Sequence, residues 1–190
     1  MPNTYTQLYV HVIFSVKRRS NLISPVWKEQ LFQYITGIIT HKNQKMMAIN
    51  GMTDHLHILI GLKPDCKLSD LVRDIKSNSS KWINENNFVA GKFEWQTGFG
   101  AFTVGQSQIK RVVNYILNQE EHHKKKTFRD EYITFLKAYQ IEFQPEYIFE
   151  DDGNYEHVAP TELQMAQFHG FPINMPLLRS CCCSFLKIEP

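Results

Sequence analysis

The sequence contains few cysteines and no long apolar run, and both absences exclude classes of protein. Only four cysteines occur in 190 residues, Cys66 and the adjacent Cys181, Cys182 and Cys183. Three adjacent cysteines fit neither a Cys-x-x-Cys zinc spacing nor a disulfide framework, so we expect a reducing, cytoplasmic environment. No apolar run approaches the roughly 18 residues that a membrane span requires, and the N-terminus does not resemble a signal peptide. We therefore expect no membrane partner.

Net charge also gives little indication of a partner. The formal net charge of +2 is too small to indicate nucleic-acid binding by itself, so that interpretation depends on local clusters. Two clusters are candidates for contacts with a phosphate backbone: Lys17, Arg18 and Arg19, and then Arg73, Lys76 and Lys81. A solvated helix face is the ordinary explanation of the second cluster, which lies mostly off the apolar stripe of its expected helix.

Segments with the period of a strand alternate with segments that have the period of a helix. Alternating apolar residues predict strands near 8–16, 46–52, 55–62 and 93–104. Apolar stripes predict helices near 25–39, 68–84, 107–121 and 129–139, and Asn50-Gly51 is a candidate hairpin turn. From residue 151 the chain holds four of its eight prolines and no clear period. We predict one domain over 1–150 and an irregular tail over 151–190.

The stretch "DHLHILIGL" places two histidines inside an apolar strand. Alternation sends Leu56, Ile58 and Ile60 to one face, which must pack beneath helices, and His55 and His57 to the other. Cα atoms two residues apart on a strand are about 6.8 Å apart, so two imidazoles on one face can converge on one ion. A bare His-x-His is more often a pair of packing or surface histidines, and further features are needed to favour a metal site.

One such feature lies on the helix expected over 107–121. Its apolar stripe is expected to be buried, and it consists of Ile109, Val112, Val113, Ile116 and Leu117. Tyr115 points away from that stripe, and Gln119 lies four residues later on the same face. The helix therefore presents a phenol and an amide together.

The combination of "HLH" in a strand and "YILNQ" on a late helix resembles the single-tyrosine HUH transposases of bacterial insertion sequences. The resemblance extends through "INGMTDHLHILIGL", "LVRDIKSNSSKWINE", "FEWQTGFGAF" and "VVNYILNQEEHH", and covers roughly residues 1–150. It implies an α+β fold, a ferredoxin-like or RRM-like sandwich with a central antiparallel sheet and helices on one face. Tyrosine transposases associated with repetitive extragenic palindromes (REP) use the same chemistry, and the sequence does not separate the two groups.

The resemblance also implies the reaction. Tyr115 would attack a single-stranded DNA phosphodiester at hairpin-marked element ends, giving a 5′-phosphotyrosine link. His55, His57 and the Gln119 carbonyl oxygen would hold Mg²⁺ or Mn²⁺, since two nitrogens and one neutral oxygen leave open positions. The partners implied are single-stranded DNA with a hairpin and a second copy of the chain. In that homodimer, the tyrosine helix of one subunit would complete the histidine site of the other.

Two rival functions remain open. A non-catalytic module for single-stranded nucleic acid would stack bases on an open sheet face carrying Tyr5, Tyr9 and His11. His11 is otherwise a candidate for a contact with DNA or with the histidine pair. A structural zinc protein would instead add His122 and His123 to His55 and His57. The usual explanation of the later pair is that cations complement the dipole at a helix C-terminus.

Overall fold

The computed structural model describes residues 5–124, 126–144 and 148. The chain divides into two units, 1–153 and 154–190, and all of the described residues belong to the first. The tail predicted over 151–190 lies outside the described residues. The strands are β1 (Leu8–Ser15), β2 (Lys45–Gly51), β3 (His55–Leu62) and β4 (Gly100–Thr103). The α-helices are α1 (Lys28–His41), α2 (Leu68–Glu85), α3 (Ile109–Leu117), α4 (Gln119–His123) and α5 (Phe128–Ala138), and short 3-10 turns cover Lys17–Arg19 and Gln106–Gln108.

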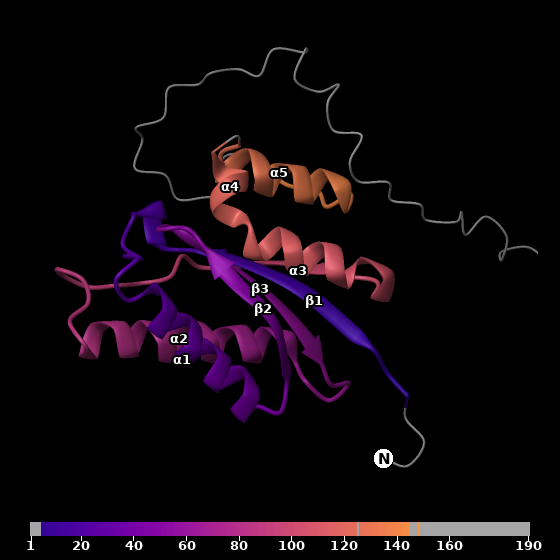
Figure 1. Ribbon diagram of the computed structural model, residues 1–190, viewed down its shortest axis with the longest axis horizontal. Coiled ribbons are helices and arrows are strands. Elements are labelled where there is room, and N and C mark those ends of the chain that lie inside the picture. The colour runs from indigo at the N-terminus through magenta and orange to yellow at the C-terminus, as the bar shows by residue number, and fades with distance from the viewer. Residues whose placement is uncertain (1–4, 125, 145–147, 149–190) are drawn as a thin grey trace, which may run out of the picture. The chain divides into compact units, whose positions relative to one another are not determined.

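The four strands form one antiparallel sheet in the order β2-β3-β1-β4 (Figure 1). The predicted α+β fold with a central antiparallel sheet is therefore confirmed. The strand that carries both histidines, β3, is flanked on both sides, and its neighbour β1 pairs with it along its whole length. An internal strand holds its side chains in fixed register, which suits a strand that positions a site.

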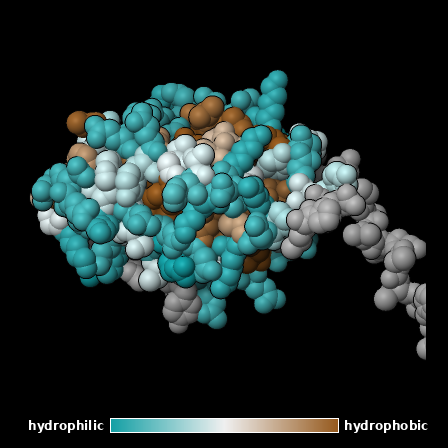
Figure 2. Space-filling view, turned by 90° about the horizontal axis from the view of Figure 1, so that it is seen from below, coloured by the Kyte–Doolittle hydropathy of each residue, from teal (hydrophilic) through white to brown (hydrophobic). Residues whose placement is uncertain are grey.

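Helices α1 and α2 cover one face of this sheet, as expected. Alternate residues of β1 and β3 point to that face and are fully buried there, among them Val12, Ile58 and Ile60. The apolar stripes of the two helices complete this core with Leu31, Ile35, Leu71, Val72 and Ile75. Figure 2 shows this side of the molecule from outside, where hydrophilic residues predominate and hydrophobic ones form small patches between them.

The opposite face of the sheet is not open, because α3 and α5 pack on it (Figure 1). Ile116 of α3 packs with Leu59 of β3, while Phe128 and Leu136 of α5 pack with Ile13 of β1. The histidine-bearing face is thus buried between the sheet and a second helical layer. Sequence periodicity predicts the face of the sheet on which the histidines lie, but it does not predict that α3 and α5 cover that face.

Two local predictions were wrong. Asn50 and Gly51 lie inside β2, and the turn of the hairpin falls at residues 52–54. Gly51 is needed there for close approach, since a side chain at this position would collide with the backbone carbonyl of His55. The single helix expected over 107–121 is broken at Asn118, whose φ of −101° and ψ of 26° separate α3 from α4. Leu117, expected in the buried stripe, is 56% exposed.

Among the described residues, no helix is both long enough and apolar enough to cross a lipid bilayer.

Candidate metal centre and tyrosine site

The pairing of β1 with β3 brings three histidines together. Ile13 lies opposite His57 and Ser15 lies opposite His55, so His11, one pleat further along β1, shares their face of the sheet. The Nε2 atom of His11 lies 3.0 Å from the Nδ1 atom of His57. Exposed fractions of 0–2% show that all three rings are buried.

The second helical layer adds two more ionisable side chains to this cluster. His123 ends α4, and Glu131 lies in the first turn of α5. Thr127 caps α5 by accepting a hydrogen bond from the backbone amide of Asp130, which fixes where the helix begins. Glu131 therefore points back toward the sheet and is only 2% exposed.

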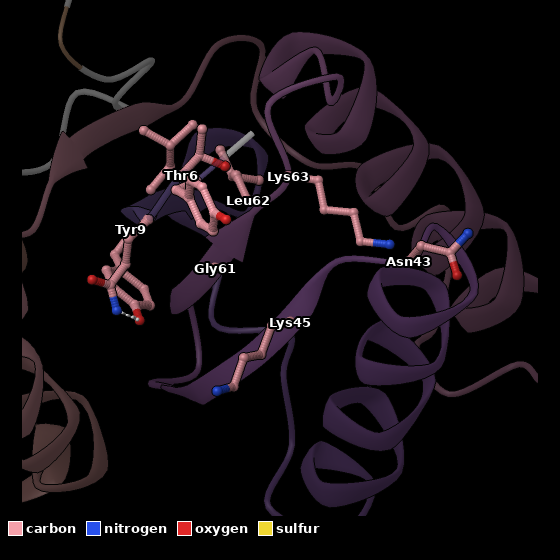
Figure 3. A pocket seen from close by; sticks show the side chains of 10 residues that line it. Thr6, Tyr9, Asn43, Lys45, Gly61, Leu62 and Lys63 are labelled. Atoms are coloured by element: carbon pink, nitrogen blue, oxygen red, sulfur yellow. Dashed lines mark hydrogen bonds between the residues drawn. The ribbon is translucent and has the colours of Figure 1, made fainter. Parts of the chain in front are cut away.

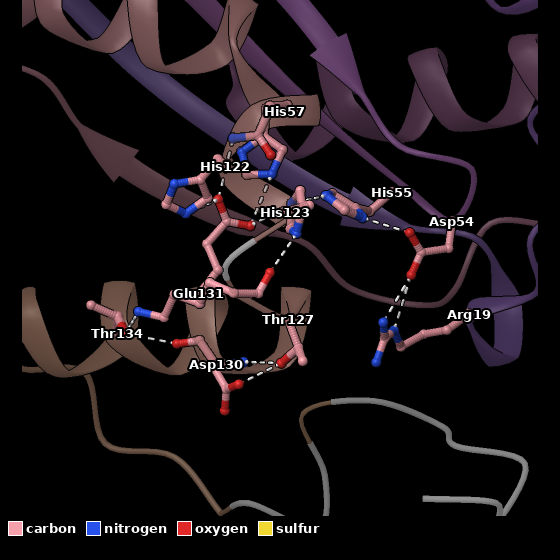
Figure 4. Close-up of polar contacts among 12 residues, drawn as sticks. Arg19, Asp54, His55, His57, His122, His123, Thr127, Asp130, Glu131 and Thr134 are labelled. Atoms are coloured by element: carbon pink, nitrogen blue, oxygen red, sulfur yellow. Dashed lines mark hydrogen bonds and ion pairs between the residues drawn. The ribbon is translucent and has the colours of Figure 1, made fainter. Parts of the chain in front are cut away.

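Four ligand-type side chains converge at one point: His55, His57, His123 and Glu131 offer donor atoms that all lie within 4.8 Å of one another (Figure 4). The Nε2 atoms of His55 and His123 are 3.0 Å apart. The Glu131 Oε2 atom lies 3.3 Å from Nε2 of His123 and 3.4 Å from Nε2 of His57. This donor set, three imidazole nitrogens and one carboxylate oxygen, is one that divalent metal ions use in proteins.

Asp54 and Arg19 support the cluster from outside. The Asp54 carboxylate accepts a 2.7 Å hydrogen bond from Nδ1 of His55 through one oxygen. Its other oxygen accepts two hydrogen bonds from the Arg19 guanidinium, at 2.9 and 3.2 Å. A carboxylate behind a histidine fixes its tautomer and ring orientation, as is common around metal ligands.

Burial controls the charge of these groups. It lowers the pKa of His11 to about 3 and that of His123 to about 4, and it lowers the pKa of His55 and His57 as well. Burial, together with the charge of Asp54, raises the pKa of Glu131 to about 8. The histidines are therefore neutral at pH 7, with lone pairs free to coordinate, and a cation at this point would favour ionised Glu131.

Gln119 and Tyr115 lie at the edge of the same cluster. The Gln119 amide donates a 3.2 Å hydrogen bond to Glu131 Oε1, while its Oε1 atom is buried without a hydrogen-bond partner among the described residues. Tyr115 is partly buried, and its ring centroid lies 6.0 Å from that of His57 and 5.1 Å from that of His122. The predicted nucleophile and the predicted ligands are thus brought together within one chain.

The candidate DNA-binding residues lie in varied surroundings. His11 contacts His57 and not solvent. Ion pairs with neighbouring carboxylates are formed by Lys17, Arg19, Arg73 and Lys81. Lys76 donates to the backbone carbonyls of Gln96 and Gly98, and partial burial lowers its pKa to about 8. Arg18 is exposed on the short turn after β1. Their role in binding DNA stays a prediction.

Sequence reasoning missed Glu131 and Asp54. Glu131 stands in the helix sequence "FRDEYITFLKA", where an acidic residue ordinarily faces solvent. The one signal available for Asp54 was its place immediately before the His-x-His.

A surface hollow lies near the start of β1 and the end of β3, away from the histidine cluster. Its lining includes Thr6, Tyr9, Lys45 and Lys63 (Figure 3). It has no comparable group of ligands, so the histidine cluster remains the candidate site.

Comparisons with known proteins identify the family to which this chain belongs. The sequence family described as "Transposase IS200 like" matches residues 4–119. The ISDra2 transposase TnpA of Deinococcus radiodurans is 23% identical over 124 residues, which cover 60% of this chain and 86% of that protein. The transposase for insertion sequence element IS200 of Salmonella typhimurium is 25% identical over 120 residues, covering 60% of this chain and 78% of that protein.

One solved structure supports the same fold. The crystal structure of a Deinococcus radiodurans R1 transposase superposes with a TM-score of 0.51 at 21% identity, over 63% of this chain and 95% of that one. A REP-associated tyrosine transposase bound to a REP hairpin gives a TM-score of 0.49 at 17% identity, over 84% of this chain and 98% of that one. With a family match across more than half of its length, this chain belongs to the IS200-like transposase family.

Proposed function

We propose that this protein is a single-tyrosine DNA transposase that cuts and rejoins single-stranded DNA at hairpin-marked ends through a 5′-phosphotyrosine intermediate. The observation that carries the proposal is the position of Tyr115 against His57, beside four ligand-type side chains of which three are buried and His123 is partly buried. A family of transposases supplies the class of reaction. The site supplies a nucleophile and a place for a cation, which phosphoryl transfer requires.

In this reaction the phenol oxygen of Tyr115 forms a bond to the phosphorus of a DNA phosphodiester. The bond from phosphorus to the 3′-oxygen breaks, the phenol loses its proton, and the departing 3′-oxygen gains one as a hydroxyl. One phosphoester replaces another, so rejoining requires no separate energy source. A phenol with an ordinary pKa of about 10 can serve both as nucleophile and as leaving group in such a reversible exchange.

His55, His57 and the Gln119 carbonyl oxygen would hold a divalent ion, for which sequence reasoning favours Mg²⁺ or Mn²⁺. The unpartnered, buried Oε1 atom of Gln119 and Nε2 atom of His57 support this assignment, because a buried polar atom ordinarily has a partner. When bound, such an ion polarises and orients a phosphoryl oxygen. His11 and Asp54 hold the rings of the two histidines in place.

The rival interpretation as a base-stacking module fits the structure poorly. That function requires the sheet face with His11 to be exposed, whereas His11 is 2% exposed beneath the second helical layer. The rings of Phe135 and Tyr115 lie against it, with centroids at 5.4 and 6.2 Å. This sheet face is covered and has Tyr115 against it, which favours the enzyme over the base-stacking module.

We further propose that the protein acts as a homodimer on DNA with a hairpin, with each site completed in trans. In one chain, Asn50 of β2 donates a 2.9 Å hydrogen bond to the Leu117 carbonyl, which helps to hold α3 against its own sheet. The same contact would form between two chains if α3 were exchanged. Which chain supplies Tyr115 is therefore a question for experiment.

The decisive experiment for the proposed function is a search for the covalent intermediate. Wild-type protein would be incubated with a divalent ion and single strands of its flanking genomic DNA, and then resolved on a denaturing gel. We expect an adduct with wild type and none with Tyr115→Phe, which should still bind DNA because only the nucleophilic oxygen is removed. Tyr34→Phe, which alters a tyrosine stacked on Trp82 in the other helical layer, is the matched control. An undiminished adduct from Tyr115→Phe would assign the nucleophile elsewhere.

A further inference from the structure

Three histidines of the site direct the same ring atom inward. The Nε2 atom of His55 lies 3.0 Å from that of His123, and the Oε2 atom of Glu131 lies 3.3 Å from Nε2 of His123 and 3.4 Å from Nε2 of His57. Ligands about 2.0–2.1 Å from one zinc ion lie about 3.3 Å apart when they form a tetrahedron. These three separations are close to that spacing, and all four donor atoms lie within 4.8 Å of one another, so they can converge on a single small ion.

The outward ring atoms of the same histidines each have a partner. Nδ1 of His55 faces Asp54, Nδ1 of His57 faces His11, and Nδ1 of His123 lies 3.0 Å from the backbone carbonyl of Lys126. A carboxylate and a carbonyl can only accept, so His55 and His123 carry their proton on Nδ1. Metal-binding histidines show this pattern, in which the nitrogen that does not bind the ion donates to an outer group.

This tautomer assignment leaves two lone pairs facing each other. In their neutral forms, His55 and His123 present bare Nε2 atoms to one another at 3.0 Å, and neither can donate a hydrogen bond. The Nε2 atom of His57 and the Oε2 atom of Glu131 are also buried without a hydrogen-bond partner in the described part of the chain. Neutral His55 and His123 thus face each other as two acceptors, a contact that is unfavourable unless a proton or a cation lies between them.

We propose that His123 and Glu131 bind the same metal ion as His55 and His57, in a four-ligand site that takes a transition ion such as Zn²⁺ far more tightly than Mg²⁺. Three imidazole nitrogens favour such an ion, since Mg²⁺ prefers oxygen ligands and retains its waters. The expectation of Mg²⁺ or Mn²⁺ depended on a smaller donor set with Gln119 as the third ligand; in the four-ligand site His123 and Glu131 take its place, and a phosphoryl oxygen would join the ion as a fifth ligand. The site also joins three elements, because β3 supplies two ligands, α4 supplies one and α5 supplies one, so the ion fastens the second helical layer to the sheet.

The neighbouring His122 provides a sharp contrast. It precedes His123 on α4, yet its Nε2 atom lies 3.6 Å from Oε1 of Glu131, the carboxylate oxygen that faces Gln119. Its side chain is 29% exposed, whereas that of His123 is 8% exposed. The structure therefore includes only one of the two adjacent histidines in the four-ligand site.

The inference deepens the proposed function, because it concerns the ion of the same site, but its test uses no DNA. The full-length chain would be freed of metal with a chelator, and its affinity for Zn²⁺ measured by competition with a chromogenic indicator. Co²⁺ would then be added as a spectroscopic probe, since the intensity of its visible absorption differs between four-coordinate and six-coordinate sites. Thermal unfolding with and without Zn²⁺ would report whether the ion stabilises the fold.

We expect one Zn²⁺ per chain, a four-coordinate Co²⁺ spectrum and a higher Tm with Zn²⁺. Glu131→Gln and His123→Asn should each weaken Zn²⁺ binding by at least on the order of 100-fold, since loss of an outer partner alone costs about 10–100-fold. Both should also lose the four-coordinate spectrum. His122→Asn and Glu29→Gln, an exposed residue of α1, should bind as wild type does.

Wild-type affinity in either Glu131→Gln or His123→Asn, or a six-coordinate Co²⁺ spectrum in wild type, would overturn the four-ligand site. Circular dichroism of each metal-free variant would separate lost binding from lost folding, and two chemically different variants guard against one that fails to fold. The covalent DNA adduct depends on Tyr115 and is scored separately. Failure of the metal test with an intact adduct would thus reject this inference alone.

Discussion

The ring of Tyr115 stands nearly edge-on to the ring of His57, with their centroids 6.0 Å apart and their planes at 78°. The two residues are far apart in sequence and meet because α3 packs over β3. A phosphate that contacted an ion at His57 would therefore lie close to the phenol. The predictions below test the consequences of this arrangement.

Single-stranded DNA should be cut and the same sequence as duplex should not. Tyr115 lies on a helix that is packed on the sheet, so the scissile phosphate must be delivered by a strand flexible enough to reach it. Binding should weaken with salt, by a slope of about −0.7 in log K against log salt for each phosphate neutralised. Gel cleavage assays and binding titrations at several salt concentrations would measure both effects. Equal cutting of duplex would contradict this prediction.

Loss of either strand histidine should abolish the covalent adduct. His55→Ala and His57→Ala each remove a donor at the centre of the cluster, and we expect adduct formation to fall below detection while single-stranded DNA still binds. Gln119→Ala should be less severe, with partial recovery in excess Mn²⁺. His41→Ala, at the exposed end of α1, is the control for loss of a histidine. Adduct formation at the wild-type rate by His57→Ala would remove the histidines from the mechanism.

Mixing two inactive variants should restore activity if sites are completed in trans. A heterodimer of Tyr115→Phe with His55→Ala would contain one doubly defective site and one intact site, so cleavage approaching half of the wild-type value per heterodimer is expected. Gln119 should follow Tyr115 in the same assay if α3 and α4 exchange together. No recovery from a verified heterodimer would establish cis completion, which is the contact seen within one chain.

The metal-free protein should be most stable near pH 6.5. The buried histidines have pKa values below 6.5, with His11 at about 3, so the unfolded chain binds more protons below that pH and stability is lost as the pH falls. Glu131 acts in the opposite direction: its pKa of about 8 exceeds the ordinary 4.5, so its contribution is lost as the pH rises through 8. Each group changes the free energy of unfolding by about 1.4 kcal/mol per pH unit within its window.

Urea unfolding in a chelator at pH 5, 6.5 and 8.5 would measure this profile. His11→Phe should reduce the slope with which the free energy of unfolding declines below pH 6.5, by the contribution of one histidine. Glu131→Gln should flatten the decline toward pH 8.5. Stability that rises or falls continuously across the range would show that these burial effects are absent.

Much of the site could be predicted from sequence because its central parts obey local periodicity. Alternation along 55–62 placed His55 and His57 on one face, and the spacing of Tyr115 and Gln119 placed them near each other. The contribution of α5 has no such signal. Glu131 is buried because Phe128 and Leu136 of its helix pack on the far side of the sheet, and helical periodicity does not show where a helix docks. His123 was recognised as a candidate only through a rival zinc interpretation.

The break at Asn118 divides the candidate site residues of this region between two short helices, α3 and α4. Tyr115 lies before the break, while Gln119 and His123 lie after it. A change in the backbone angles of Asn118 would alter the position of Tyr115 relative to the residues that face the histidine strand, at the cost of the contacts of α3 with β2 and β3. If the proposed covalent intermediate forms, the DNA end would be joined to the segment before the break, and two candidate ligands would lie in the segment after it. Asn118 is thus a joint between these two segments.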